Sequence, residues 1–228
     1  MEKLTRVFAA ALACLLAQQF TFADEGSAAR PAFFAFCMDT HDSQKRSLEQ
    51  QAALLEELGY DGAGHLWLDN LEERLKTLDA HGLRLFQVYL QVNIAADANS
   101  PYDPRLKESL PLLRGRKTML ALLMSGAAPS DPALDERAVA LVQEIADMAN
   151  EAGVRVALYP HSGNWLEHVE DGLRIVQKAK RPNVGVMFNL CHWLKVDDEK
   201  NLKPLLTSAM PHLFAVSIHG ADRAEEIH

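Results

Sequence analysis

Three short segments in the second half of the chain carry a histidine beside other polar and aromatic side chains. They read Tyr-Pro-His-Ser-Gly-Asn-Trp at 159–165, Phe-Asn-Leu-Cys-His-Trp at 188–193 and Ser-Ile-His-Gly-Ala-Asp at 217–222. The imidazoles of His161, His192 and His219 could supply nitrogen ligands to one divalent metal ion, and Asn189 would add an amide oxygen. A metal ion held in this way would act as a Lewis acid on a carbonyl or hydroxyl group.

Each of these histidines also has an ordinary explanation, because a single histidine at a strand end is more often a hydrogen-bonded surface or core residue. Three of them behind three different predicted strands favour a common site, since polar groups on loops of one face rarely have only structural roles. We therefore predict that His161, His192 and His219 share one site. His65, which closes an earlier predicted strand, is a further candidate.

Three tryptophans also follow predicted strands directly, and two interpretations of them stay open. Large aromatic side chains usually belong to the core, but an indole beside a sugar site can stack on the C–H face of a sugar ring. In the second interpretation the substrate-binding residues are His65, Trp67, Trp165, Trp193 and Asn164.

Some charged residues have a simpler explanation. Asp39 and Asp69 precede predicted helices, where an aspartate side chain usually caps the first turn. The charged run Glu72-Glu73-Arg74 is typical of a solvated helix end. We expect none of these residues to take part in catalysis.

Short apolar runs alternate with longer amphipathic ones along the chain, which predicts an α/β fold. The predicted strands are 33–37, 60–66, 83–92, 117–124, 154–159, 184–188 and 213–218. The predicted helices are 43–58, 70–81, 104–113, 131–152, 165–179 and 198–208. Strands separated by helices call for a parallel sheet with right-handed crossovers.

A parallel sheet can stay open as a doubly wound sheet or close into a barrel. The polar side chains fall at or just after the C-terminal ends of successive strands, and in a barrel these ends meet at one mouth. This placement favours a (β/α)8 TIM barrel. Seven strands and six helices make it incomplete, so we expect one barrel domain over 24–228 that lacks its eighth strand.

Composition and the N-terminus limit the function. The chain has 228 residues, of which 48% are hydrophobic and 24% charged, and its formal net charge of −8 argues against nucleic acid as a partner. Lys3 and Arg6 precede the apolar run 7–16, and small residues before Asp24 suggest cleavage after Ala23. Residues 1–23 are thus predicted to be a signal peptide, which implies a periplasmic or secreted protein. A membrane anchor is the alternative, but the apolar run is short for a span of ~20 residues.

Removal of this leader would leave Cys37 and Cys191 as the remaining cysteines. Each lies at the end of an apolar run, so we expect buried free thiols rather than a disulfide.

The order of these motifs resembles that of the sugar phosphate isomerase/epimerase family. The similarity rests on Gly-Tyr-Asp-Gly at 59–62, Tyr-Pro-His, Asn-Leu-Cys-His and Ser-Ile-His-Gly, and it extends over 33–222. The resemblance implies the xylose-isomerase-like barrel, a fold that the family shares with endonuclease IV.

The resemblance also implies one divalent metal, bound by Glu, Asp, His and Glu after strands five to eight. His219 matches the third ligand, and His192 matches a histidine that usually follows the Asp. Asn189 stands in place of that Asp and Tyr159 in place of the first Glu. An amide lacks the charge that holds Mn²⁺ or Mg²⁺, so nitrogen-rich ligation of Zn²⁺ is the alternative.

Tyr159 is a poor base at neutral pH because its ordinary pKa is about 10, so His161 would replace it as the base or as a ligand.

Two functions follow from these departures. The first is an exported enzyme of the isomerase/epimerase type, or a lyase or hydrolase, that acts beside a carbonyl of an unphosphorylated sugar or keto-sugar. The second is a carbohydrate-binding protein without catalysis. The sequence does not specify an oligomer, and it makes an endonuclease a poor third candidate.

Overall fold

The computed structural model describes residues 30–36 and 38–218. The chain divides into two compact units, Met1–Ala32 and Phe33–His228, and every described helix and strand belongs to the second. The predicted signal peptide, Cys37 and His219 therefore lie outside the described residues.

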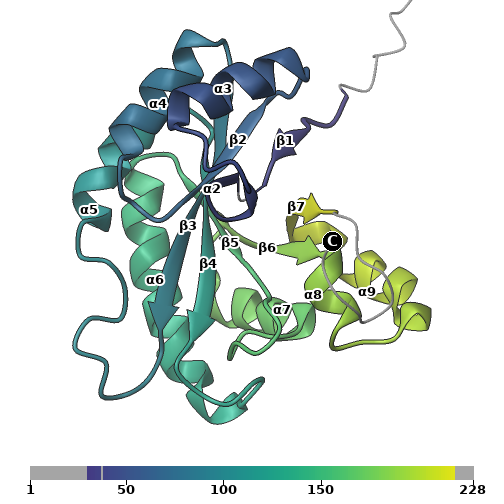
Figure 1. Cartoon of the computed structure of the whole chain (residues 1–228). Coiled ribbons are helices and arrows are strands. Elements are labelled where there is room, and N and C mark those ends of the chain that lie inside the picture. Colours follow the sequence, from purple (N-terminus) through teal and green to yellow (C-terminus); the bar gives the residue numbers. More distant parts are fainter. Residues whose placement is uncertain (1–29, 37, 219–228) are drawn as a thin grey trace, which may run out of the picture. The chain divides into compact units, whose positions relative to one another are not determined.

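One parallel sheet forms the centre of the second unit (Figure 1). Its seven strands follow one another in chain order, so that each strand pairs with the next one in the sequence. They are β1 (Phe34–Ala35), β2 (Gly62–Leu66), β3 (Arg84–Asn93), β4 (Met119–Ser125), β5 (Arg155–Leu158), β6 (Val184–Asn189) and β7 (Leu213–Ser217).

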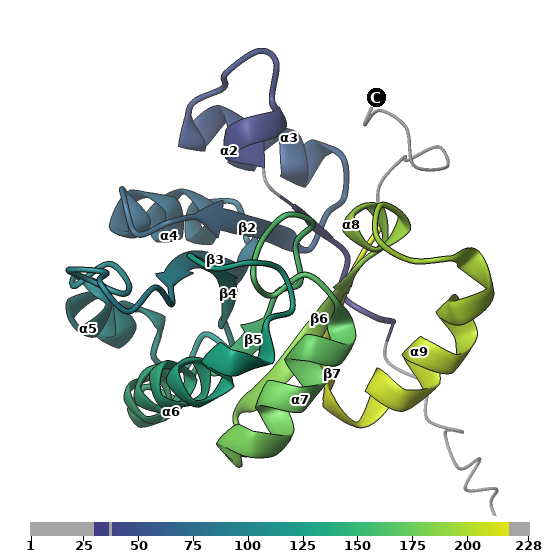
Figure 2. The ribbon, with the colours of Figure 1, turned by 90° about the horizontal axis from the view of Figure 1, so that it is seen from below.

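Helices connect the strands and surround them on the outside of the curved sheet (Figure 2). They are α2 (Met38–His41), α3 (Leu48–Glu57), α4 (Leu71–Ala80), α5 (Leu106–Ser109), α6 (Asp135–Glu151), α7 (Val169–Ala179), α8 (Leu190–Leu194) and α9 (Leu202–Ala209). Short 3-10 turns extend several of them. Strictly sequential order with helices outside is the arrangement of a barrel wall, not of a doubly wound sheet. The predicted incomplete (β/α)8 barrel is confirmed, with seven of the eight strands that close this fold.

The alternation of side chains along each strand builds two apolar clusters. On β3, Val88, Leu90 and Val92 belong to the large cluster between sheet and helices. Tyr89 lies between them in sequence and belongs to a second, smaller cluster with Ala121, Tyr159 and Met187. Because successive side chains of a strand point to opposite faces, the smaller cluster fills the inside of the curve.

Several helix boundaries differ from the prediction for local reasons. Helix α3 begins at Leu48 because the Ser47 side chain and Gln50 form a reciprocal capping box. Asp131 caps a 3-10 turn with Pro132 at its start, as the sequence indicates. Helix α7 begins only at Val169, because the segment before it makes other backbone hydrogen bonds. The His161 N–H donates to the Leu166 carbonyl, and the Leu166 N–H donates to the Met124 carbonyl on β4. The short helices α2 and α8 were not predicted.

Cys191 is a buried free thiol, as expected. Within the described ranges, no helix combines the length and apolarity needed to cross a membrane.

Gly62, at the start of β2, offers a direct test of this packing. A Cβ added there would lie 1.9 Å from the carbonyl oxygen of Arg84 on the neighbouring strand. Gly82 also has a positive φ (+66°), but a Cβ there would meet nothing within 4 Å. We expect Gly82→Ala to cost about 1–2 kcal/mol of unfolding free energy from backbone strain alone. Gly62→Ala should cost more than about 3 kcal/mol, measured by urea denaturation. Equal losses would contradict this close strand contact.

Candidate active site

A cavity of about 550 Å³ lies at the C-terminal ends of the strands, on the inside of the curve. We call it the mouth cavity. Its lining consists of Phe36, Thr40, Leu66, Trp67, Tyr89, Gln91, Leu123, Ser125, Tyr159, His161, Asn164, His192 and Lys195. Five predicted site residues from three separate segments therefore share it, including the predicted catalytic residues Tyr159 and His161, at the end of the sheet where active sites of this architecture lie.

Three aromatic rings form the floor of the mouth cavity. Phe36 meets Tyr89 and Tyr159 edge-on, with ring centroids 5.4 and 6.0 Å away. Tyr89 and Tyr159 are 5.8 Å apart. Gly64 on β2 leaves room for Tyr89, since a Cβ there would lie 3.1 Å from its ring. The apolar faces of such rings keep water away from polar groups above them.

His161 and His192 stack on each other beside this floor. Their ring centroids are 3.7 Å apart with 36° between the planes, and both rings lie about equally far from Tyr159 at 6.0 and 5.9 Å. His161 Nδ1 lies 3.0 Å from the carbonyl oxygen of Ser162, which can only accept. His161 Nδ1 therefore carries the proton, and Nε2 is the basic nitrogen.

Burial is the main influence on the charge of His161. It lowers the pKa of this imidazole from the ordinary value of 6.5, the Ser162 carbonyl opposes that effect, and the Lys195 charge lowers the pKa further. His161 is consequently neutral at pH 7, the state in which an imidazole accepts a proton.

Asn189 connects the second histidine to Tyr159. Its Oδ1 accepts the backbone N–H of His192 at 3.1 Å and so caps α8. Its Nδ2 donates to the Tyr159 hydroxyl at 3.0 Å. His192 Nδ1 lies 3.1 Å from Ser162 Oγ. One amide thereby fixes the hydroxyl of Tyr159 and the backbone of His192, whose ring contacts Ser162.

A divalent metal does not fit the described donors. Asn189 uses both ends of its amide within the protein. Across residues 30–36 and 38–218, no three His, Cys, Asp or Glu side chains are grouped so that they could hold a metal ion. The fourth predicted donor, His219, is outside these ranges.

The family model for the xylose isomerase-like TIM barrel matches residues 52–228. The chain belongs to this family. The resemblance inferred from the sequence is thus confirmed at the level of the barrel superfamily. No curated protein matches the chain in sequence.

Several solved structures share the fold. A D-allulose 3-epimerase from Methylomonas sp. is 20% identical over 81% of this chain and 73% of its own, with a TM-score of 0.63. A 3-keto-D-glucoside 4-epimerase from E. coli is 15% identical over 74% and 72%, at a TM-score of 0.57. A probable 3-DHS dehydratase from Bacillus anthracis is 16% identical over 81% and 72%, at 0.66. At such low identity these similarities establish the fold.

For two of the three tryptophans of this xylose isomerase-like barrel, the predicted role in binding a sugar ring is wrong. Trp165 is fully buried and donates to the Asp131 carbonyl at 2.8 Å. Trp193 is 3% exposed and donates to the Asp197 carboxylate. Both belong to the large cluster between sheet and helices. Their core interpretation therefore holds, because each indole N–H finds its partner inside the protein.

Trp67 does line the mouth cavity, and its backbone is unusual. Its φ of +61° is the left-handed conformation, which a bulky side chain adopts only when the surroundings enforce it. Asn164, held by its backbone N–H on the His161 carbonyl, lines the same cavity.

His65 does not reach the mouth cavity as predicted. It is 4% exposed, and its Nε2 contacts the Asp69 carbonyl at 2.7 Å while Nδ1 contacts Arg74 Nε at 3.2 Å. His65 Nε2 donates to the Asp69 carbonyl, which can only accept, and Nδ1 also lies 3.4 Å from Asp39 Oδ2. Both ring nitrogens are used, which leaves His65 a positioning role.

The charged residues around His65 also correct the sequence interpretation. Arg74 is fully buried, not solvated, and its Nη2 donates to Asp39 and Gln51 at 2.6 Å each. Asp39 accepts the Leu66 N–H instead of capping a helix. Asp69 is no cap either, since Asn70 precedes α4 and Asp69 pairs with Arg105. We call Asp39, Arg74 and His65 the buried triad.

The sequence interpretation also missed some of the cavity lining. Phe36, Thr40, Gln91, Ser125 and Lys195 were not proposed. Gln91 carried a usable signal, because Gln87, Tyr89 and Gln91 alternate with apolar residues along β3. That alternation marks the face of the strand that turns toward the inside of the barrel.

The buried triad predicts a large stability cost for Asp39→Asn. Burial raises the pKa of Asp39, but nearby His65, the Arg74 charge and the Leu66 N–H outweigh it and lower the pKa to about 2. The variant would leave the Arg74 cation without its counterion, which costs about 3–5 kcal/mol. Asp79→Asn is the matched control, since it removes the partner of the exposed Arg116 and should cost under about 1 kcal/mol.

Urea denaturation across pH tests the same pair. The folded pKa of Asp39 lies below its unfolded value of 3.8, so its stabilisation is complete above pH 4 and disappears as the pH falls through about 2. This portion of the acid dependence should be absent in Asp39→Asn. Similar losses for both variants at neutral pH would contradict a buried ion pair.

Proposed function

We propose that this chain is a sugar isomerase/epimerase-like enzyme that moves a proton at a carbon beside the carbonyl of a small carbohydrate. The neutral, partly buried His161 at the end of the barrel strands carries the proposal. A neutral imidazole is a suitable base near pH 7, where a proton on the α-carbon of a ketose or aldose must be accepted and returned. The solved structures named for D-allulose 3-epimerase and 3-keto-D-glucoside 4-epimerase support a carbohydrate as the partner.

The geometry supports a division of roles. His161 Nε2 takes the proton as the C–H bond breaks, and the electron pair moves onto the carbonyl oxygen to give an enediolate. The Tyr159 hydroxyl donates a hydrogen bond to that oxygen and so stabilises its negative charge. The hydroxyl is the stronger donor because its own oxygen accepts a hydrogen bond from Asn189 Nδ2. Return of the proton from His161 to the neighbouring carbon, while that carbon's hydroxyl proton passes to the former carbonyl oxygen, completes an isomerisation. Epimerisation requires the enediolate to turn its opposite face to His161 before the same carbon takes the proton back.

The remaining lining residues bind the sugar. Trp67 offers an apolar ring face, while Asn164, Gln91 and Ser125 offer amide and hydroxyl groups to its hydroxyls. Lys195 is the single cation among the described lining residues. A lining with one exposed lysine suits an unphosphorylated sugar better than a sugar phosphate, which agrees with the predicted export of the protein.

The division of roles proposed for His161 and Tyr159 invokes no metal ion. The divalent metal that the resemblance implies stays a prediction, and it rests on His219 together with His192. If the two bind one ion, His192→Ala and His219→Ala should each lower the metal content of the purified full chain. Full metal occupancy in both variants would contradict a shared site.

Carbohydrate binding without catalysis is the second candidate. The observation in its favour is the lack of any carboxylate among the described lining residues of the mouth cavity. In that case the protein binds sugars but does not remove a proton from any carbon of the sugar.

Hydrogen exchange separates the two candidates. The full chain is incubated in D2O with ketoses and aldoses, and NMR measures deuterium uptake at the carbon beside the carbonyl. We expect uptake by the wild type and a loss of about 10²–10⁴-fold in His161→Ala, the usual share of a general base. His81→Ala is the control, because His81 pairs with Glu49 and Glu56 outside the cavity. Binding without uptake would favour the second candidate, and full uptake in His161→Ala would contradict the role of this base.

The pH dependence gives an independent check on His161. Because burial lowers its pKa below 6.5, the uptake rate should rise with pH through a pKa under 6.5 and stay level above it. A rate that still rises between pH 7 and 9 would point to another base.

A further inference from the structure

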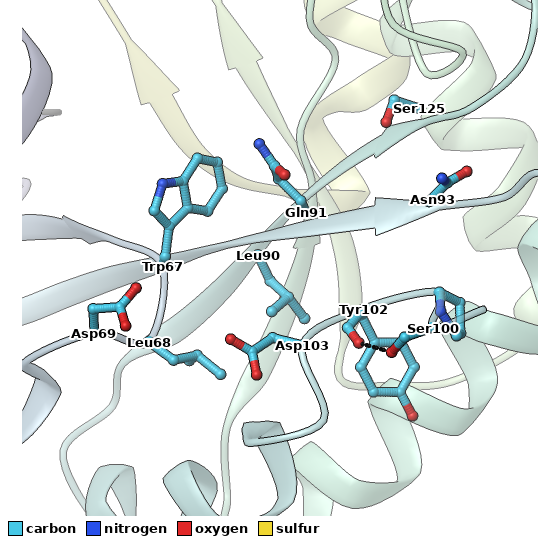
Figure 3. Close-up of a pocket in the computed structure, with 11 residues that line it drawn as sticks. Trp67, Leu68, Asp69, Leu90, Gln91, Asn93, Ser100, Tyr102, Asp103 and Ser125 are labelled. Carbon is cyan, nitrogen blue, oxygen red and sulfur yellow. Dashed lines mark hydrogen bonds between the residues drawn. The ribbon is translucent and has the colours of Figure 1, made fainter. Parts of the chain in front are cut away.

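A second cavity opens beside the mouth cavity, with a volume of about 420 Å³ (Figure 3). We call it the side cavity. It is lined by Trp67, Leu68, Asp69, Leu90, Gln91, Asn93, Ser100, Pro101, Tyr102, Asp103 and Ser125. Trp67, Gln91 and Ser125 line both cavities. A ligand seated in one would therefore touch residues that also face the other.

The segment that follows β3 forms one wall of the side cavity. The segment after β3 folds back, so that the Asn93 N–H donates to the Pro101 carbonyl at 2.7 Å. Arg137 holds the start of this segment through the carbonyls of Ile94 and Ala95. Gly126 permits the approach of the next loop, since a Cβ there would lie 1.9 Å from Asn93 Oδ1. The wall is thus tied to the barrel at both ends.

The polar groups of the side cavity suit neutral hydroxyls. Asp69 and Asp103 both accept from the guanidinium of Arg105, at 2.8 and 2.6 Å. Their charge is partly balanced and their side chains are oriented, while each carboxylate keeps further lone pairs for acceptance. Gln91 and Asn93 add amides. Such a mixture offers both donors and acceptors to sugar hydroxyls, whereas a cation site would need unpaired carboxylates.

Aromatic rings border the same space. Trp67 stands between Asp69 and Gln91 in Figure 3, on the boundary of the two cavities. The Tyr102 hydroxyl donates to Glu144 at 2.6 Å, which holds the ring at the cavity by its far end. Indole and phenol faces pack against the apolar faces of sugar rings, so each cavity has its own aromatic contact.

We infer that the side cavity is a subsite for a second sugar unit, and that the substrate is a glycoside of at least two units. This inference rests on the proposed function, because the reacting unit would lie at His161 in the mouth cavity. The glycosidic bond would pass Trp67, whose strained backbone places the indole between the two units.

Ser100 allows the inference to be tested without touching the mouth cavity. It lines the side cavity alone, and its hydroxyl donates to the Tyr102 carbonyl at 2.6 Å. Ser100→Phe would fill the side cavity, while Ser100→Ala removes the same hydroxyl and fills nothing. Asp103→Asn is a second variant that keeps the volume and weakens an acceptor.

Calorimetry with the full chain measures binding of reducing disaccharides (maltose, cellobiose and lactose) and of their component monosaccharides. We expect at least one disaccharide to bind about 10-fold or more tighter than its components. Ser100→Phe should abolish that advantage and leave monosaccharide binding unchanged, Ser100→Ala should keep it, and Asp103→Asn should reduce it.

The outcomes distinguish this inference from the proposed function. Equal affinity of the wild type for disaccharides and monosaccharides, or an advantage that survives both Ser100→Phe and Asp103→Asn, would overturn the subsite while the sugar enzyme stands. Deuterium uptake into monosaccharides as fast as into disaccharides would overturn it as well. If neither class of sugar binds, the proposed function fails and the subsite fails with it.

Discussion

The described strands are all parallel and follow chain order, and this constraint decides where chemistry can occur. Every strand then points its C-terminal end to the same rim, so the segments that follow β1, β2, β5 and β6 all meet there. A side chain needs no long-range partner in sequence to reach the rim, because its place just after a strand is enough. The histidines of two segments meet for this reason, with 3.7 Å between their ring centroids.

The buried triad shows how the fold holds one part of that rim in a strained shape. Asp39 accepts the Leu66 N–H on one side of Trp67, and His65 donates to the Asp69 carbonyl on the other. Arg74 joins the two by contacting both Asp39 and His65. The backbone is thereby fixed immediately before and after a residue with left-handed φ, as strain at a functional site requires. Burial of the guanidinium is unfavourable, and the contacts that it makes keep the Trp67 indole between the two cavities.

The sequence could predict the barrel because alternating apolar runs and amphipathic helices leave few arrangements, and strand-end polar residues then favour closure. It also found His161 and His192, since both follow strands directly. It could not separate Trp67 from Trp165 and Trp193, because all three follow strands and only packing decides which indole N–H finds a partner in the core. Arg74 was misjudged for a related reason. Its charged neighbours suggest solvent, but position 74 lies on the face of α4 that meets the sheet, together with Leu71, Leu75 and Leu78.

The types of side chain that line the mouth cavity link these observations to the proposed chemistry. No carboxylate is among its described lining residues, so in the proposed reaction an imidazole accepts the proton, and an imidazole is a useful base only if it stays unprotonated. Burial and the adjacent Lys195 both disfavour a positive charge on His161. Tyr159 stands where the resemblance implies a glutamate, and this difference has a physical consequence. A nearby carboxylate would attract a proton to His161, whereas a phenol held by Asn189 leaves the imidazole neutral and still offers a hydrogen bond to the developing oxyanion.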